Sequence, residues 1–422
     1  MEKITLKNGL RVLLEYQPYA RTACFGVWVK SGSLYEKEEN NGISHFIEHM
    51  VFKGTSMRSA RRIAEEMDEI GGQMNAYTAK DYTCFYARTL EEHVEQGFSI
   101  LADMVTGPRF DPHDVETEKG VVLEEIGMSD DTPEDKVVEN QYAAVWRGSS
   151  AGMPILGRTG SLAVMDTAAL RSYYQEKYTP RRMVVAICGR FERAAFLDCV
   201  KRYFGSLVPG IEPDEPETIL YQKQCVVQTE EQEQTHICLC MPGLPAGHPK
   251  RYALNILHII AGGSTSSRLF QRVREELGLA YSIFTDVTSY AGGGLFEIQT
   301  AVTPGADQKV CKEILHVLEG LRRGVTEKEL ARAREQLKSS VVMSMESSAS
   351  RLGSMGKGEL LRRRVRTEDE LLAEIEAVTL DEVNRIAKQV LDLNQLAVSV
   401  LGPECQRSFY HNLVCGESKR GR

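Results

Sequence analysis

The sequence predicts an α+β fold made of two homologous domains, each a mostly antiparallel sheet with helices. Three observations lead to this prediction. The chain has 422 residues, more than the about 100–200 residues of one typical domain. Residues 45–47 (His-Phe-Ile) match residues 258–260 (His-Ile-Ile), and at the same offset the apolar run ending at Gly189 matches the run ending at Gly402. Strand-like and helix-like segments also come in blocks rather than in strict alternation, which favours antiparallel pairing.

A proline-rich acidic stretch marks the junction between the two copies. Residues 209–219 contain Pro209, Pro213 and Pro216 beside acidic residues. Proline interrupts helices and central strands, so this stretch is typical of a linker. We therefore expect an N-terminal domain over residues 1–208, a linker over 209–219 and a C-terminal homologous domain over 220–422.

The elements of the first half follow from turn signals and hydrophobic periodicity. The dipeptide Asn8-Gly9 predicts a hairpin turn because both residues tolerate positive φ. Ser59 is a preferred helix N-cap, and Gly71-Gly72 ends the helix that Ser59 begins. We expect strands over 4–7, 10–14, 24–30, 73–78, 83–88 and 183–188, and helices over 43–53, 60–70, 91–105, 115–128 and 167–178. The last helix and strand recur over 379–390 and 396–401.

Composition excludes several classes of function. The 51 basic and 59 acidic residues give a net charge of −8, whereas a nucleic-acid-binding protein needs a basic surface. No apolar run approaches the about 20 residues of a membrane span, and the first residues lack the apolar core of a signal peptide. The ten cysteines form no Cys-x-x-Cys pair, which is typical of reduced thiols. We expect a cytoplasmic protein with neither nucleic acid nor membrane as a partner.

The segment His45-Phe46-Ile47-Glu48-His49 is the first candidate for chemistry. On a helix, residues four apart share one face about 6 Å apart along the axis, so two imidazoles can bind one zinc ion. Glu48 is close enough to hold a water on that zinc. This H-x-x-E-H order inverts the commoner H-E-x-x-H motif. The alternative is a polar helix face on which both histidines are satisfied without a metal.

Two glutamates on the predicted helix over 115–128 strengthen the case. Val121 and Val122 mark its buried face, and Glu118 and Glu125 flank them on the same stripe, whereas Glu124 points about 100° away. Carboxylates on an apolar stripe are costly unless they are paired or bind a metal. A zinc ion that needs a third protein ligand would explain one of them. The alternative is that this helix ends at a solvent-exposed edge, where both glutamates are hydrated.

These residues resemble the insulinase/pitrilysin metallopeptidases, and most closely the branch that contains mitochondrial processing peptidase and its bacterial relatives. The resemblance extends over essentially the whole chain. Besides His45-x-x-Glu48-His49 and the two glutamates Glu118 and Glu125, it includes residues 71–78 with Asp81 and Thr83, residues 121–126, residues 154–157 and residues 274–282.

The resemblance implies a role for each matching residue. His45, His49 and Glu125 would be the zinc ligands, and Glu48 the general base. Glu118 would orient a ligand from outside the coordination sphere. Arg274 and Tyr281 match the pair that stabilises the tetrahedral intermediate, and Asn75 and Ala76 match the edge strand that receives the substrate peptide.

The second copy lacks the metal site. At the offset of the first motif it has His258-Ile259-Ile260-Ala261-Gly262, so Ala261 replaces the base and Gly262 the second ligand. One histidine cannot hold zinc, and we interpret His258 as a packing residue. We expect the second domain to supply the opposing wall of a clamshell, with Arg274 and Tyr281 on it.

The sequence therefore predicts a zinc metalloendopeptidase that cleaves peptides or unfolded polypeptide segments with a glutamate-activated water on the zinc. Two alternatives stay open. One is a non-catalytic subunit or partner of a heteromeric processing peptidase, and the other is a metal-binding or peptide-binding module without turnover. A peptide substrate is the expected partner, and a homodimer or a paired homologous subunit is left open.

Overall fold

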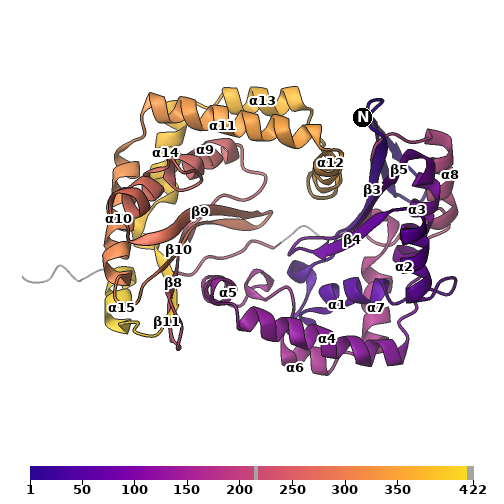
Figure 1. The fold of residues 1–422 in the computed structure, drawn as a ribbon, viewed down its shortest axis with the longest axis horizontal. Helices are drawn as coiled ribbons and strands as arrows, with labels where there is room; N and C mark the ends of the chain where they lie inside the picture. The colour runs from indigo at the N-terminus through magenta and orange to yellow at the C-terminus, as the bar shows by residue number, and fades with distance from the viewer. Residues whose placement is uncertain (213–216, 416–422) are drawn as a thin grey trace, which may run out of the picture. The chain divides into compact units, whose positions relative to one another are not determined.

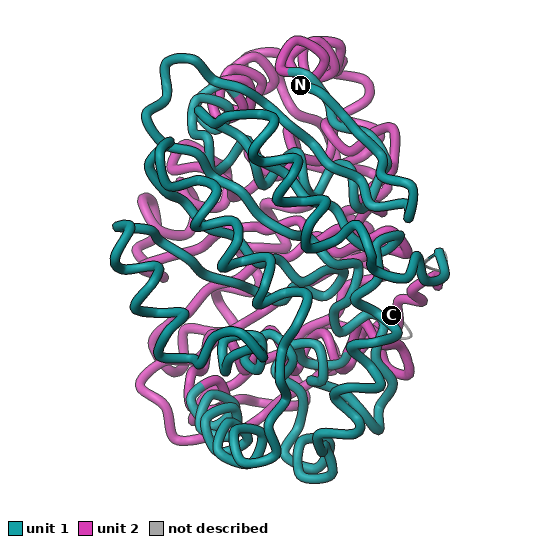
Figure 2. Tube along the Cα trace, turned by 90° about the vertical axis from the view of Figure 1, so that its right-hand side faces the viewer, with its two compact units in different colours: residues 1–128, 153–215, 342–367 teal, residues 129–152, 216–341, 368–422 magenta. Residues whose placement is uncertain are grey.

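The computed structural model describes residues 1–212 and 217–415, and the chain divides into two compact units (Figure 2). One unit holds residues 1–128, 153–215 and 342–367, and the other holds 129–152, 216–341 and 368–422. Each unit thus includes one segment from the opposite half of the chain. That a linker over residues 209–219 separates two domains stays a prediction. Residues 213–216 of this linker lie outside the described residues.

The first unit contains a sheet in the order β1-β2-β6-β3-β5-β4. Figure 1 labels its strands β3, β4 and β5. Strands β2 and β6 are parallel, and the other neighbours are antiparallel. The strand bounds are β1 Glu2–Thr5, β2 Arg11–Tyr16, β3 Thr22–Val29, β4 Gln73–Thr78, β5 Thr83–Leu90 and β6 Met183–Gly189.

The second unit repeats this topology in the order β7-β11-β8-β10-β9. Again one pair, β7 with β11, is parallel and the others are antiparallel. Strand for strand, β7, β11, β8, β10 and β9 take the places of β2, β6, β3, β5 and β4, which confirms the predicted α+β class and the repeat. The bounds are β7 Cys225–Thr229, β8 Thr235–Pro242, β9 Ala280–Tyr290, β10 Gly293–Val302 and β11 Ala397–Gly402.

The helices largely follow the predicted segments. Ser59 caps α2, with its side chain accepting a hydrogen bond from the Arg62 backbone N–H at 3.2 Å. The helix predicted over 91–105 begins as a 3-10 turn over Glu91–His93 before α3. No helix within the described parts of the chain combines the length and the apolar character of a membrane span. The α-helices are α1 Ile43–Val51, α2 Ala60–Glu69, α3 Val94–Thr106, α4 Pro112–Asp130, α5 Pro133–Val145, α6 Thr159–Ala163, α7 Thr167–Lys177, α8 Arg193–Phe204, α9 Arg251–Ala261, α10 Asp307–Arg323, α11 Glu327–Glu346, α12 Ser348–Arg362, α13 Glu368–Glu376, α14 Leu380–Val390 and α15 Arg407–Cys415.

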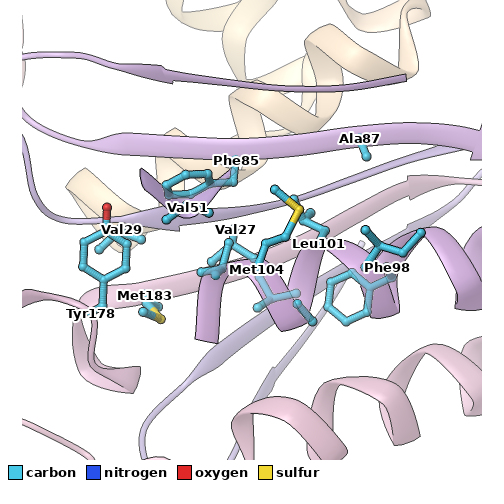
Figure 3. Packing of buried hydrophobic residues seen from close by; sticks show 14 of the residues in the cluster. Val27, Val29, Val51, Phe85, Ala87, Phe98, Leu101, Met104, Tyr178 and Met183 are labelled. Atoms are coloured by element: carbon cyan, nitrogen blue, oxygen red, sulfur yellow. The ribbon is translucent and has the colours of Figure 1, made fainter. Parts of the chain in front are cut away.

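One face of the first sheet packs on helices of the first half of the chain. Phe25 and Val27 of β3 and Phe85 of β5 point to this face, because side chains alternate along a strand. They form one buried cluster with Phe98 and Met104 of α3. Figure 3 shows side chains of β3, β5 and α3 meeting in this cluster. The core holds in place the helices that carry the candidate site.

The opposite face of the first sheet is covered by α12, which comes from the second half of the chain. Trp28 of β3 lies against Gly356, where an added Cβ would be 2.3 Å from the indole ring. Arg351 binds both carboxylate oxygens of Glu15 at 2.6 and 2.7 Å. The first unit therefore needs α12 to bury Trp28, although α12 lies far away in the sequence.

The second sheet receives α5, from the first half of the chain, in the same way. Tyr142 of α5 donates a hydrogen bond to Glu297 of β10 at 3.1 Å, and Thr288 donates to the same oxygen at 2.7 Å. Glu297 is completely buried, and burial raises its pKa to about 7, with a further increase from nearby Asp286. The sheet thus holds α5 through a carboxyl group that is protonated in mildly acidic solution.

We expect the stability of the second unit to decrease as the pH rises from about 4.5 to 7. The folded chain keeps the Glu297 proton in this window and the unfolded chain does not, so the folded state binds more protons. The effect should reach about 3 kcal/mol above pH 7. Glu297→Gln keeps an acceptor for Tyr142 and should remove this decrease, which urea unfolding at pH 5 and 8 measures. An equal decrease in the variant and the wild type would contradict the assignment.

Candidate metal centre

Helix α1 begins at a firmly held N-terminus. Its N-cap Gly42 has φ +95°, a left-handed conformation that glycine adopts without strain. The buried carboxylate of Glu36 accepts hydrogen bonds from the backbone N–H groups of Gly42 at 2.7 Å and Ser44 at 2.9 Å. A carboxylate at this end satisfies free N–H groups and interacts favourably with the helix dipole. These contacts fix the start of α1 just before the first candidate ligand.

Three candidate ligands converge between α1 and α4. His45 Nε2 and His49 Nε2 are 3.2 Å apart, and Glu125 Oε2 lies 3.6 Å from the first and 3.5 Å from the second. Their ligand atoms all lie within 4.8 Å of one another, and no other such group of His, Cys, Asp or Glu is found in residues 1–212 and 217–415. Figure 1 shows α1 with β4 on one side and α4 on the other. The arrangement matches the predicted helical spacing.

The donor set fits a zinc ion. His45 is 8% exposed, and burial, with a contribution from His49, lowers its pKa to about 3, so its imidazole is neutral. His49 Nδ1 lies 3.0 Å from Glu118, which places the proton on Nδ1 and leaves a lone pair on Nε2. Two imidazole nitrogens and one carboxylate oxygen form a common ligand set of catalytic zinc.

Glu118 contacts the candidate ligand His49 and is not part of the group of three candidate ligands. It is 4% exposed, with Oε1 toward His49 and Oε2 2.5 Å from Lys53 Nζ. A carboxylate that accepts the second N–H of a ligating histidine fixes the orientation of the ring. The family resemblance implies this role for Glu118. Lys53 was not predicted, and its only sequence signal is its position four residues after His49.

The buried stripe of α4 differs from the prediction at one residue. Val122 is buried together with Glu118, but Val121 is 43% exposed, so its assignment to the buried face was wrong. Consecutive helical residues point about 100° apart, and therefore the two valines cannot both lie at the centre of one stripe. Glu125, seven residues after Glu118, lies on the same face, and Glu124 is exposed.

Glu48 lies beside the cluster and is held from β4. The hydroxyl of Thr78 donates a hydrogen bond to Glu48 Oε2 at 2.5 Å. Burial raises the pKa of Glu48, and the Thr78 hydrogen bond opposes this increase. Glu48, which the resemblance implies is the general base, is therefore held by a residue of β4. This contact could not be predicted from the sequence, because β4 is not adjacent to α1 in the chain.

Strand β4 forms the outer edge of the first sheet. It pairs with β5, and no described strand pairs with its other edge. Asn75 is exposed, and Ala76 packs against the core below the sheet. Asn75 and Ala76 thus lie on an edge strand, which can accept another strand. The Ala76 backbone N–H donates a hydrogen bond to the Asn75 side-chain oxygen at 2.8 Å.

Arg274 and Tyr281 lie together within the second unit. The Arg274 guanidinium lies 4.7 Å from the centre of the Tyr281 ring and 4.9 Å from that of Phe270. Arg274 belongs to a π-helix over Phe270–Glu276, which the sequence did not predict, and Tyr281 is 79% exposed on β9. The structure brings this pair together, and its link to the metal centre stays a prediction.

In the second unit, the residues that correspond to the metal site pack against Thr285. His258 of α9 lies 2.8 Å from the Thr285 hydroxyl. Ala261 is buried, and a Cβ added to Gly262 would lie 2.7 Å from a Thr285 side-chain carbon. No ligand can occupy the second histidine position without displacing Thr285.

Two family models match consecutive parts of the chain. Residues 11–159 match the family model described as insulinase (peptidase family M16), and residues 165–337 match the peptidase M16 inactive domain. The uncharacterized zinc protease YmxG of Bacillus subtilis is 41% identical over 409 residues, which cover 96% of this chain and 98% of that protein. The uncharacterized zinc protease Rv2782c of Mycobacterium tuberculosis is 39% identical, with 95% and 93% covered.

Solved structures share the fold of the whole chain. The crystal structure of a peptidase M16 inactive domain from Pseudomonas fluorescens superimposes with a TM-score of 0.89 at 18% identity. The match covers 96% of this chain and 98% of that chain. A protease from Helicobacter pylori superimposes with a TM-score of 0.88 at 21% identity, with 95% and 99% covered. At these identities the likeness concerns the fold.

Proposed function

Because the chain belongs to the insulinase family of peptidases, peptidase family M16, we propose that it is a zinc-dependent endopeptidase acting on peptides or unfolded polypeptide segments. The observation that carries this proposal is the convergence of two histidine nitrogens and a glutamate oxygen within 4.8 Å. A separate carboxylate, Glu48, lies beside them on α1. Metal ligands and a neighbouring base are the parts that hydrolysis of an amide requires.

In this proposal His45, His49 and Glu125 hold the zinc ion, and Glu118 orients the His49 ring. When bound, zinc lowers the pKa of a water molecule and polarises the carbonyl of the scissile bond. Glu48 takes the proton of the attacking water and passes it to the leaving amine. The hydrogen bond from Thr78 occupies Oε2 of Glu48, which leaves Oε1 for proton transfer.

The substrate segment would pair with β4 as an added strand. Its main chain would bind the free edge beside Asn75 and Ala76, which gives affinity with little demand on sequence. Thr78, at the end of the same strand, contacts Glu48. Pairing along β4 would therefore lead an extended peptide toward the base.

Arg274 and Tyr281 are proposed to stabilise the oxyanion of the transition state from the second domain. We expect Arg274→Ala to lower kcat by about 10²–10³-fold, the usual effect of losing one oxyanion donor, with little change in zinc content. Tyr281→Phe should act in the same direction. Kinetics and zinc analysis on the same preparations measure both effects. Wild-type rates in both variants would contradict this role.

The alternative is a non-catalytic subunit or partner of a heteromeric processing peptidase. Digestion of a peptide library by the purified zinc-loaded chain, read by mass spectrometry, distinguishes it from the proposed enzyme. Cleavage by the single chain supports the endopeptidase, whereas zinc binding without any cleavage contradicts it. A cytoplasmic location and a homodimer or paired homologous subunit remain proposals.

A further inference from the structure

We propose that Thr78 is a positioning residue, which holds the Glu48 carboxylate for proton transfer and connects it to the strand proposed to bind substrate. The inference rests on the proposed function, since it concerns the base of that reaction. The contact is short, 2.5 Å between Thr78 Oγ1 and Glu48 Oε2, and both side chains are partly buried. It joins α1, which carries two of the candidate zinc ligands, to β4.

The Thr78 hydroxyl has one proton, and its neighbours show where that proton goes. Thr83 lies opposite Thr78 on β5, with the two hydroxyl oxygens 3.3 Å apart. The Thr83 hydroxyl donates its own proton to the Ser31 carbonyl oxygen at 2.8 Å. Thr78 therefore donates toward the much closer Glu48 carboxylate, a charge-assisted bond that is stronger than one between neutral groups.

This hydrogen bond selects one orientation of the Glu48 carboxylate. The terminal torsion of a glutamate has a broad energy profile, so without a partner the carboxylate rotates easily. With Oε2 bound to Thr78, Oε1 keeps a defined position from which it can accept a proton. Because Thr78 is the last residue of β4, a peptide that pairs with β4 would also steady this contact.

A positioning role predicts a loss in kcat that the conservative variant restores. Thr78→Val keeps the shape of the side chain and removes the donor. We expect kcat to fall by about 10–100-fold, as for a small misplacement of a reacting group. KM and the content of one zinc per chain should not change. Thr78→Ser keeps the hydroxyl and should retain kcat within about threefold of the wild type.

A matched control is available on the neighbouring strand. Thr89 of β5 is buried, and its hydroxyl has no hydrogen-bond partner among the described residues, so Thr89→Val makes the same chemical change without removing such a bond. We expect this variant to have wild-type kcat. If Thr78→Val does not fold, Thr78→Ala compared with Thr78→Ser gives the same test.

The experiment measures kcat, KM, zinc content and melting temperature for all variants with one quenched peptide. A fall in kcat with unchanged KM and zinc, restored by serine, supports the inference. Wild-type kcat in Thr78→Val, or a fall that serine does not restore or that zinc loss accompanies, overturns it. An inactive wild type would instead refute the proposed function, so the two failures are distinguishable.

Discussion

Replacing Glu48 with glutamine should lower kcat by about 10²–10⁴-fold, the usual contribution of a general base, while one zinc stays bound. Glutamine has nearly the same shape and can still accept the hydrogen bond from Thr78, but it cannot take a proton from water. Glu48 does not belong to the group formed by His45, His49 and Glu125, so zinc affinity should not depend on it.

The measurement for Glu48→Gln is single-turnover cleavage of a quenched peptide together with zinc analysis of the same preparation. Wild-type cleavage by the variant would show that another group acts as base. A variant without zinc would show that Glu48 is a ligand. Either result would contradict the assignment of Glu48 as the general base.

Glu125→Gln should lose most of the zinc, whereas Glu124→Gln should keep it. Glu125 Oε2 lies within 3.6 Å of both histidine nitrogens, and Glu124 is exposed on another face of α4. An amide is a poorer zinc ligand than a carboxylate. The loss of affinity should exceed the about 10–100-fold that removal of an outer hydrogen-bond partner typically costs.

Competition with a chromophoric chelator measures zinc affinity in both variants, and a melting curve checks that each is folded. The two substitutions change charge equally and lie one residue apart, so a general electrostatic effect would appear in both. Equal zinc affinity in Glu124→Gln and Glu125→Gln would contradict the ligand assignment.

Features that depend on local spacing could be predicted from the sequence. His45 and His49 share a face because they are four residues apart, and the seven-residue spacing places Glu118 and Glu125 on one side of α4. The predicted and observed bounds of β4 are the same, because alternation and the preceding Gly71-Gly72 define that strand. The exposed Val121 shows that periodicity fixes relative directions but not the centre of a buried stripe.

Features that depend on distant contacts could not be predicted. The packing of α12 on Trp28 and of α5 on the second sheet joins segments from opposite halves of the chain, and no local pattern encodes it. Thr78 supports α1 through one hydrogen bond to Glu48, and Glu36 supports it by accepting hydrogen bonds from the Gly42 and Ser44 backbone. An ordinary threonine or glutamate shows no sequence signal for such a role without the fold.

The most direct test of a single catalytic zinc in the first domain is a titration of the metal-free protein. Chelator-treated chain receives zinc in steps, and the initial rate of peptide cleavage is measured at each step. The rate should rise from near zero in proportion to added zinc and reach its maximum at one zinc per chain. Full activity without zinc, or a maximum only at two or more zinc ions per chain, would contradict the centre formed by His45, His49 and Glu125.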